Sequence, residues 1–204
     1  MSKRAPRFVR REKDFYPTEA RAVKPLIPHL PIGVRYFEPC AGDGRLIRHL
    51  RRHGMVCTGA IDIEQRDDFI PVGDALELVD RDLGGAELIV TNPPYERNTM
   101  HAMIERFRRL RPTWLLLESD WLMTLQAEPL LTYASDIVAV GRVKKIDGSK
   151  SAGYDNHAWV RFQATPTATR FHARARVLKV SYDTEAEHEI ARSTHRPHLD
   201  QAAA

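Results

Sequence analysis

The stretch Val34-Arg35-Tyr36-Phe37-Glu38-Pro39-Cys40-Ala41-Gly42-Asp43-Gly44 decides the fold that we predict for this chain. Residues 34–38 are predicted to form a strand, and residues 44–53 are predicted to form a helix. The loop between them consists of small residues that let the backbone approach a ligand, and the helix N-terminus presents N–H groups to it. A dinucleotide site would need a third glycine where the chain has Ile47, so the loop does not favour a pyrophosphate ligand.

Strands and helices are predicted to alternate along the chain on both sides of this unit. Further strands are predicted over residues 56–61, 69–72, 88–90, 114–117, 136–146 and 157–163. Further helices are predicted over residues 19–29, 99–110 and 121–128. This alternation predicts an α/β fold with a seven-stranded, mostly parallel sheet and helices on both faces, in which the last two strands form a hairpin at the edge.

The length of 204 residues favours one folded domain. We expect that domain at residues 14–165, after a basic, flexible N-terminus at residues 1–13. An irregular C-terminal extension is expected at residues 166–204, with a disordered end. The N-terminal basic residues either contact phosphate or keep the protein soluble.

The composition predicts a soluble, cytoplasmic protein. Apolar residues make up 43% of the chain and charged residues 28%, and no apolar run is long enough to span a bilayer or to form a signal core. Cys40 and Cys57 are too few for a disulfide framework, and neither they nor the scattered histidines have the spacing of metal ligands, so we predict no metal site. A net charge of +4 and a pI near 9.2 permit a nucleic acid as partner.

Asn92-Pro93-Pro94-Tyr95 follows the buried strand predicted at residues 88–90 and is expected to form a rigid ledge. The prolines fix φ and donate no hydrogen bond, so the local carbonyl groups stay available as acceptors. Asn92 adds a side-chain amide, and Tyr95 adds a flat ring with a polar tip. Acceptors beside a ring suit a planar NH2 group. The alternative is an ordinary exit from a strand into a turn.

Three carboxylates, Glu38, Asp62 and Asp74, follow successive predicted strands. Ligands of open α/β sheets bind outside the carboxyl ends of the strands, where these side chains are expected. Glu38 can accept a hydrogen bond from an ammonium group, Asp62 can bind both hydroxyls of a ribose, and Asp74-Ala75 can receive an adenine amino group. S-adenosylmethionine carries an amino acid and an adenosine and therefore suits this set.

These motifs resemble those of S-adenosylmethionine-dependent amino-methyltransferases, and most closely those of compact phage and prophage N6-adenine DNA methyltransferases. The similarity covers residues 14–162 and rests on Phe15-Tyr16-Pro17-Thr18, residues 37–44, Asp62, Asp74 and Asn92-Pro93-Pro94-Tyr95. It implies a Rossmann-like class I methyltransferase fold, with the methyltransferase domain at residues 14–165. It also implies direct in-line transfer of a methyl group to the N6 amino group of adenine in DNA, without a metal or a covalent intermediate.

The resemblance implies roles for individual residues. The Asn92 side-chain oxygen and the Pro93 carbonyl, beside Pro94, would accept hydrogen bonds from the target NH2, and Tyr95 would stack on the base once it has left the helix. The residues that would bind S-adenosylmethionine are Tyr16, Pro17, Thr18, Glu38, Pro39, Cys40, Ala41, Gly42, Asp43, Gly44, Asp62, Ile63, Asp74, Ala75 and Asn92. Pro39-Cys40 resembles the nucleophilic dipeptide of cytosine-C5 methyltransferases, but that dipeptide follows their fourth strand, so we interpret Cys40 as a small packed residue.

The loop of the predicted hairpin is basic. Arg142, Lys144, Lys145 and Lys150 are predicted to contact substrate phosphates, and a solvated loop is the alternative.

The chain departs from sequence-specific DNA methyltransferases in having no recognizable target-recognition region. We therefore expect that its recognition sequence is short, or that its specificity is relaxed or supplied by a partner. One alternative keeps the chemistry but places it on an RNA base amino group or on a glutamine amide in a protein. Another is a non-catalytic nucleic-acid-binding module on the same fold.

Overall fold

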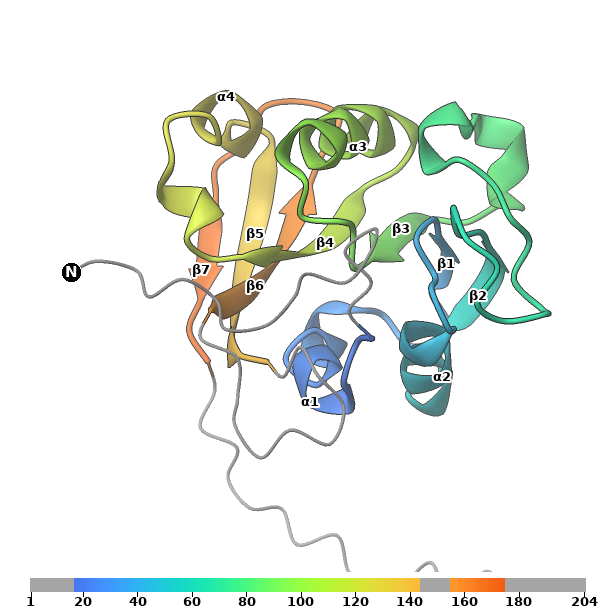
Figure 1. Ribbon diagram of the computed structural model, residues 1–204. Helices are drawn as coiled ribbons and strands as arrows, with labels where there is room; N and C mark the ends of the chain where they lie inside the picture. The colour runs from blue at the N-terminus through green and yellow to red at the C-terminus, as the bar shows by residue number, and fades with distance from the viewer. Residues whose placement is uncertain (1–16, 144–154, 175–204) are drawn as a thin grey trace, which may run out of the picture. The chain divides into compact units, whose positions relative to one another are not determined.

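A seven-stranded sheet forms the centre of the computed structural model, which describes residues 17–143 and 155–174 (Figure 1). Its strands are β1 (Arg35–Glu38), β2 (Val56–Ala60), β3 (Leu88–Thr91), β4 (Thr113–Glu118), β5 (Ala134–Arg142), β6 (Asn156–Phe162) and β7 (Arg170–His172). The α-helices of the described residues are α1 (Ala20–Val23), α2 (Arg45–Arg52), α3 (Arg97–Leu110) and α4 (Glu128–Leu131). Short 3-10 helices are η2 (Ile27–His29), η3 (Ala75–Glu77), η4 (Asp80–Leu83) and η5 (Trp121–Met123). The basic N-terminus predicted at residues 1–13 lies outside the described residues, as do Tyr16, Lys144, Lys145, Lys150 and residues 175–204.

The strands lie in the order β2-β1-β3-β4-β6-β5-β7. β1 pairs in parallel with β2 and β3, and β3 pairs in parallel with β4. β6 is antiparallel to both β4 and β5, so β5 runs in the same direction as β4. The predicted mostly parallel sheet with one antiparallel hairpin is therefore confirmed. The carboxyl ends of β1, β3, β4 and β5 share one edge of the sheet. This edge runs across the ends of the strands and differs from the lateral edges, which are formed by β2 and β7.

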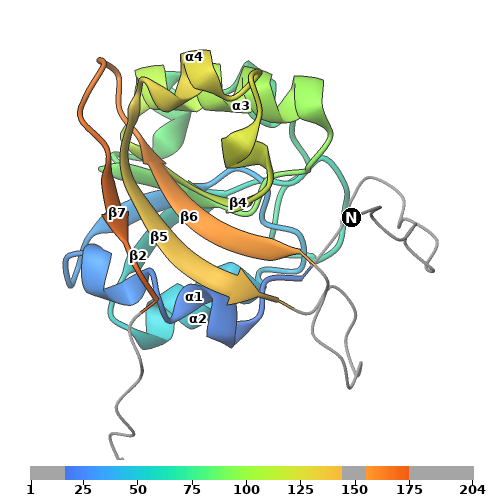
Figure 2. The same ribbon diagram turned by 90° about the vertical axis from the view of Figure 1, so that its left-hand side faces the viewer.

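Helices cover both faces of the sheet, as predicted (Figure 2). Alternate side chains of β4 enter two separate cores: Trp114 and Leu116 pack on the side of α1 and α2, and Leu115 and Leu117 pack on the side of α3 and α4. This alternation follows from the twofold side-chain period of a strand. None of the helices in residues 17–143 and 155–174 has the length and apolar character needed to cross a membrane.

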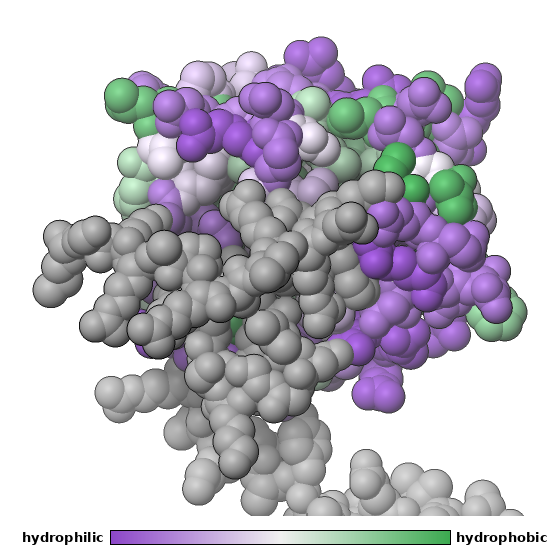
Figure 3. Space-filling view, in the orientation of Figure 1, coloured by the Kyte–Doolittle hydropathy of each residue, from purple (hydrophilic) through white to green (hydrophobic). Residues whose placement is uncertain are grey.

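α2 is amphipathic and has a basic outer surface. Leu46 and Leu50, four residues apart, are buried against the sheet, whereas Arg48, Arg51 and Arg52 are exposed. The hydrophilic surface at the lower right of Figure 3 lies over this helix. The helix begins after Gly44, whose φ of 72° is a left-handed conformation that glycine adopts without strain.

Several predicted elements are shorter than expected. The helix predicted over residues 19–29 is divided into α1 and η2, because Pro25 has no N–H to donate and clashes with the preceding turn. The strand predicted over residues 69–72 is wrong: only one bridge, between Asp62 and Val72, is present, since Pro71 cannot donate to a strand ladder. The helix predicted over residues 121–128 is also wrong, because η5 and the short α4 take its place.

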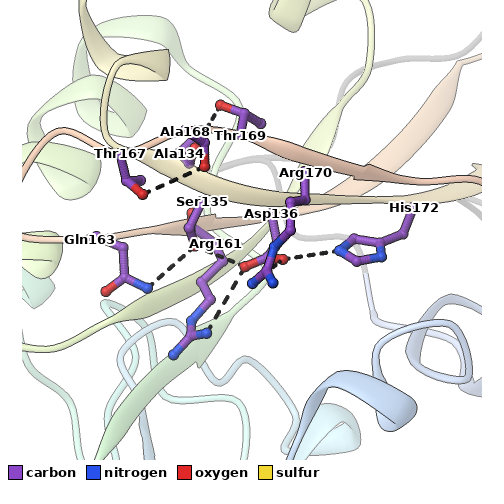
Figure 4. Close-up of polar contacts among 10 residues, drawn as sticks. All are labelled: Ala134, Ser135, Asp136, Arg161, Gln163, Thr167, Ala168, Thr169, Arg170 and His172. Carbon is purple, nitrogen blue, oxygen red and sulfur yellow. Dashed lines mark hydrogen bonds and ion pairs between the residues drawn. The ribbon is translucent and has the colours of Figure 1, made fainter.

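The hairpin of β5 and β6 is not at the edge of the sheet, because β7 pairs in parallel with β5 and lies outside it. This strand falls in the segment that was expected to be irregular. Figure 4 shows its attachment: Asp136, with 5% of its side chain exposed, binds His172 Nε2 at 2.9 Å and an Arg170 guanidinium nitrogen at 3.1 Å. Burial acts to raise the pKa of Asp136, but hydrogen bonds from His172 and Ser135 and the charge of Arg170 outweigh it and hold the pKa below its ordinary value.

Candidate functional site

A cavity of about 410 Å³ lies where β1, β2 and β3 end. Glu38 is the last residue of β1, Asp62 follows β2, and Asn92 follows β3, so the strand ends bring these three side chains together at one cavity. The predicted site residues that line it are Pro17, Thr18, Glu38, Pro39, Cys40, Ala41, Gly42, Asp43, Asp62, Ile63, Asp74, Ala75, Asn92 and Pro94. Its position outside the carboxyl ends of parallel strands is the usual ligand position of an open α/β sheet.

Glu38 is a buried carboxyl group that faces this cavity. Only 1% of the residue is exposed, and Oε2 has no hydrogen-bond partner within residues 17–143 and 155–174. Burial raises the pKa of Glu38 well above its ordinary value, and the negative charges of Asp62 and Asp43 raise it further. Burying a carboxyl group without a hydrogen-bond partner costs free energy, so the site favours a ligand with a cationic hydrogen-bond donor.

The glycine loop wraps around Asp62. The backbone N–H of Gly42 donates to Asp62 Oδ2 at 2.7 Å, and the backbone N–H of Glu64 donates to Oδ1 at 3.0 Å. Gly42 has a φ of 55°, which again requires the freedom of glycine. Each carboxylate oxygen has two lone pairs, so Asp62 keeps acceptor capacity on both oxygens for a pair of ligand hydroxyls.

The far wall of the cavity combines Asp74 with apolar groups. Asp74 caps η3, where its Oδ1 accepts a hydrogen bond from Leu76 N at 2.8 Å. Cys40 Sγ lies 3.9 Å from Met103 Sδ, and burial raises the pKa of the Cys40 thiol, with a further contribution from the charge of Asp62. A thiol with a raised pKa is a poor nucleophile. Cys40 therefore has the environment of a packed residue.

Asn92 lies at the centre of a side-chain network. Its Nδ2 donates to Thr18 Oγ1 at 3.2 Å, and its Oδ1 accepts from the Tyr95 hydroxyl at 2.8 Å. The Tyr95 ring lies against His157, with 5.8 Å between the ring centroids. His157 is buried, and its Nδ1 lies 3.2 Å from the carbonyl oxygen of Asp155. The amide of Asn92 is thus held beside an aromatic pair.

Four predicted site residues within the described part do not line the cavity: Pro93, Tyr95, Gly44 and Arg142. Pro93 is buried, and Tyr95 contacts Asn92, which lines the cavity. Arg142 ends β5 at the same edge of the sheet, where its carbonyl oxygen accepts from an Arg21 guanidinium nitrogen at 2.7 Å.

Several other residues at the site were not predicted from the sequence. The cavity is also lined by Arg45, Leu46, Arg66, Leu76, Glu96, Thr99 and Met103. Of these, Thr99 and Met103 could have been found from the sequence, because they are four residues apart on the predicted helix that follows the Asn-Pro-Pro-Tyr motif. His157, which contacts Tyr95, could not have been found from the sequence, since its position depends on the pairing of β6 with β4, in which it lies opposite Glu118.

Comparisons with known proteins give the fold. The chain matches no protein-family model, and no curated protein sequence is significantly similar to it. Its structure is similar to the methyltransferase subunit of a type I restriction-modification system from Streptococcus thermophilus, with a TM-score of 0.52, 10% identity, and coverage of 91% of this chain and 54% of that one. This chain thus spans about half the length of that subunit.

Two further solved structures have the same fold. A putative RNA methyltransferase from Pyrococcus horikoshii has a TM-score of 0.52 and 12% identity, with coverage of 75% of this chain and 89% of that one. A putative hemolysin from Lactococcus lactis has a TM-score of 0.54 and 10% identity, with coverage of 79% of this chain and 95% of that one. The strand order, the antiparallel hairpin and these likenesses together show that the chain has the Rossmann-like fold of the class I methyltransferases.

Proposed function

We propose that this protein is an S-adenosylmethionine-dependent methyltransferase that modifies the N6 amino group of adenine in DNA. The observation that carries the proposal is that one cavity is lined by the amide of Asn92 and by the buried carboxyl of Glu38, whose Oε2 has no hydrogen-bond partner among the described residues. A cofactor ammonium group and a target amino group are the ligands that these two side chains suit. Two proteins of similar fold carry methyltransferase names, which supports the class of reaction.

The residues of the cavity fit S-adenosylmethionine. Glu38 would accept a hydrogen bond from its ammonium group, which would give Oε2 the partner that it lacks among the described residues. Asp62 would accept from the two ribose hydroxyls with its remaining lone pairs, and Asp74 would receive the adenine amino group. Ile63 and Leu76 supply apolar wall for the adenine ring. When bound, the cofactor supplies an electrophilic methyl group on a positively charged sulfur.

Asn92 would prepare the target nitrogen for this transfer. Its Oδ1 and the Pro93 carbonyl oxygen would accept the two hydrogens of the target NH2 group, which draws the nitrogen towards tetrahedral geometry and localises its lone pair. Tyr95, steadied by His157, would stack on the extruded base. The protein contributes positioning and electrostatics to the reaction, and both are effects that a fixed amide and ring can supply.

DNA is the proposed partner, with the basic residues at the edge of the sheet as its phosphate contacts. Arg21 and Arg142 lie together at the carboxyl end of β5, on the same edge as the cavity. Such residues bind nucleic acid through its backbone and independently of sequence.

The test is to incubate the full-length protein with methyl-labelled S-adenosylmethionine and a panel of double-stranded DNA, RNA and protein. Nucleosides from digested DNA are then analysed by mass spectrometry. We expect N6-methyladenosine in its deoxy form. Label on RNA or on a glutamine amide would keep the chemistry and overturn the substrate, and no transfer together with no cofactor binding by calorimetry would overturn the enzyme assignment.

A further inference from the structure

The outer face of α2 carries a concentration of positive charge, within the hydrophilic surface that Figure 3 shows over this helix. Arg48, Arg51 and Arg52 are exposed on it, opposite the buried Leu46 and Leu50. Positions three and four apart are neighbours on a helix, so these three side chains share one surface, which we call the arginine face. Together with Arg45, the arginines of α2 carry a charge equal to the net charge of +4 of the whole chain.

Acidic side chains compensate this charge only in part, in the part of the chain that the structure describes. Arg48 lies 3.9 Å from the Asp67 carboxylate and donates to the Asp43 carbonyl oxygen at 2.8 Å. Arg51 and Arg52 form no ion pair and no side-chain hydrogen bond within residues 17–143 and 155–174. Two guanidinium groups of the arginine face are therefore available to an anionic partner.

Helix stability does not explain this arrangement. Basic residues in the last turn suit the helix dipole, which accounts for Arg51 and Arg52 individually. However, Arg48 and Arg52 are four residues apart, and like charges at this spacing destabilise a helix. Burial lowers the pKa of His49 on the same helix, and the charges of the neighbouring arginines lower it further. The arginine face thus has a positive potential that an anionic ligand would relieve.

The arginine face begins beside the candidate site. α2 follows the glycine loop, and its residues Arg45 and Leu46 line the cavity. A helix rises by about 1.5 Å per residue, so Arg48 and Arg52 lie about 5 and 10 Å further along the axis than Arg45. Each strand of a DNA duplex has a phosphate about every 3.4 Å along its axis. The distance from Arg48 to Arg52 therefore corresponds to about two phosphates.

We propose that the arginine face binds the phosphate backbone of the DNA duplex that flanks the target base. This role rests on the proposed function, because it requires DNA as the substrate. Guanidinium groups can donate two parallel hydrogen bonds to one phosphate, and such contacts position a duplex without reading its sequence. The face is next to β2, whereas Arg21 and Arg142 lie at β5, with four strands between the two, so the duplex would be held at two separate places.

The test measures the salt dependence of DNA binding by fluorescence anisotropy. The dissociation constant of a DNA duplex is determined between about 50 and 200 mM NaCl, with S-adenosylhomocysteine present. Each phosphate contact contributes about 0.9 to the slope of log affinity against log salt. Arg51→Gln with Arg52→Gln removes two contacts, so the slope should fall in magnitude by about 1.8. The loss of affinity relative to the wild type should then be about 12 times larger at about 50 mM than at about 200 mM salt.

Two further pairs of substitutions separate phosphate contact from folding and from general charge. Arg51→Lys with Arg52→Lys keeps both charges and should keep most of the slope. Glutamine has nearly the helix propensity of arginine, so α2 should persist in the glutamine pair, which calorimetry with S-adenosylhomocysteine checks. Arg81→Gln with Arg109→Gln is the matched control: these side chains are 88% and 70% exposed on η4 and α3, and their loss should leave the slope unchanged.

The outcomes distinguish this role from the proposed function. A wild-type slope in the glutamine pair, or an equal fall of the slope in the control pair, overturns the role of the arginine face. If the wild-type protein still forms methylated DNA in that case, the proposed function stands. A wild-type protein that neither binds nor methylates DNA would overturn both.

Discussion

Replacing Glu38 by glutamine should stabilise the unliganded protein at alkaline pH and weaken cofactor binding at the same time. Glutamine keeps the size of the side chain and removes its ionisation. The wild-type residue is 1% exposed, and Oε2 has no hydrogen-bond partner in the part of the chain that the structure describes, so the charged form of this carboxyl is poorly solvated. A cationic ligand reverses this, because it gives the charged form a partner.

The effect on stability follows from the direction of the pKa shift. Burial, Asp62 and Asp43 raise the pKa of Glu38 in the folded protein, so the folded state binds more protons than the unfolded state between the two pKa values. The free energy of unfolding of the wild type therefore falls as the pH rises from the ordinary value of 4.5 through the raised pKa. Glu38→Gln lacks this slope, and its advantage over the wild type grows across the same interval.

The effect on binding follows from one lost charge-assisted hydrogen bond. Such a bond contributes about 1.5–3 kcal/mol, which corresponds to a dissociation constant raised by about 10- to 160-fold. Wild-type binding should also release up to about one proton per site, because the ligand cation favours the ionised carboxylate. Glu38→Gln should release none.

Isothermal titration calorimetry in two buffers of different ionisation enthalpy measures affinity and proton release together. Urea unfolding at pH 5 and pH 8 measures stability. Glu128→Gln, an exposed carboxyl on α4 away from the cavity, is the matched control and should change neither quantity. A Glu38→Gln protein with wild-type affinity and wild-type proton release would refute the assignment of Glu38 to the cation.

Four further predictions concern the site and the core. Asn92→Ala should abolish methyl transfer while calorimetry finds cofactor affinity within about twofold; unchanged turnover would refute its role. Tyr95→Ala should raise the KM for DNA by about 5- to 150-fold because stacking on the base is lost, whereas Tyr95→Phe keeps the ring and should raise the KM much less. An equal rise of the KM in both variants would refute stacking. Arg108→Ala should lower the free energy of unfolding by about 1–3 kcal/mol in urea, because its buried guanidinium bonds the Ala164 carbonyl oxygen; wild-type stability would contradict this. Cys40 should react slowly with iodoacetamide at pH 7.5, owing to its raised pKa, and a rate like that of free cysteine would contradict the packed environment.

The positions of Glu38, Asp62 and Asn92 could be predicted from the sequence, because each follows an apolar run that is recognizable as a strand. Parallel strands that alternate with helices must end at one edge of a sheet, which brings the residues after them together. The exact set of strands could not be predicted in the same way. Residues 69–72 have the apolar character of a strand, but Pro71 limits them to a single bridge.

Contacts that depend on the choice of strand partners or on the docking of a helix could not be predicted from the sequence. β7 has only three residues, Arg-Phe-His, which are too few to identify a strand by its alternation of polar and apolar positions, and Arg170 and His172 hold it to Asp136. The contact of Thr18 with Asn92 depends on where α1 docks. The approach of His157 to Tyr95 depends on the insertion of β6 between β4 and β5.

The attachment of β7 has a consequence for how much of the chain can be removed. Without it, β5 would be the outermost strand, with nine residues and a row of unsatisfied backbone groups open to another molecule. The three residues of β7, with Arg170 and His172 at its two ends, form a blunt, charged border in its place. A protein shortened before residue 170 should therefore associate edge to edge and precipitate, whereas one shortened after residue 174 keeps the border that holds neighbouring molecules apart.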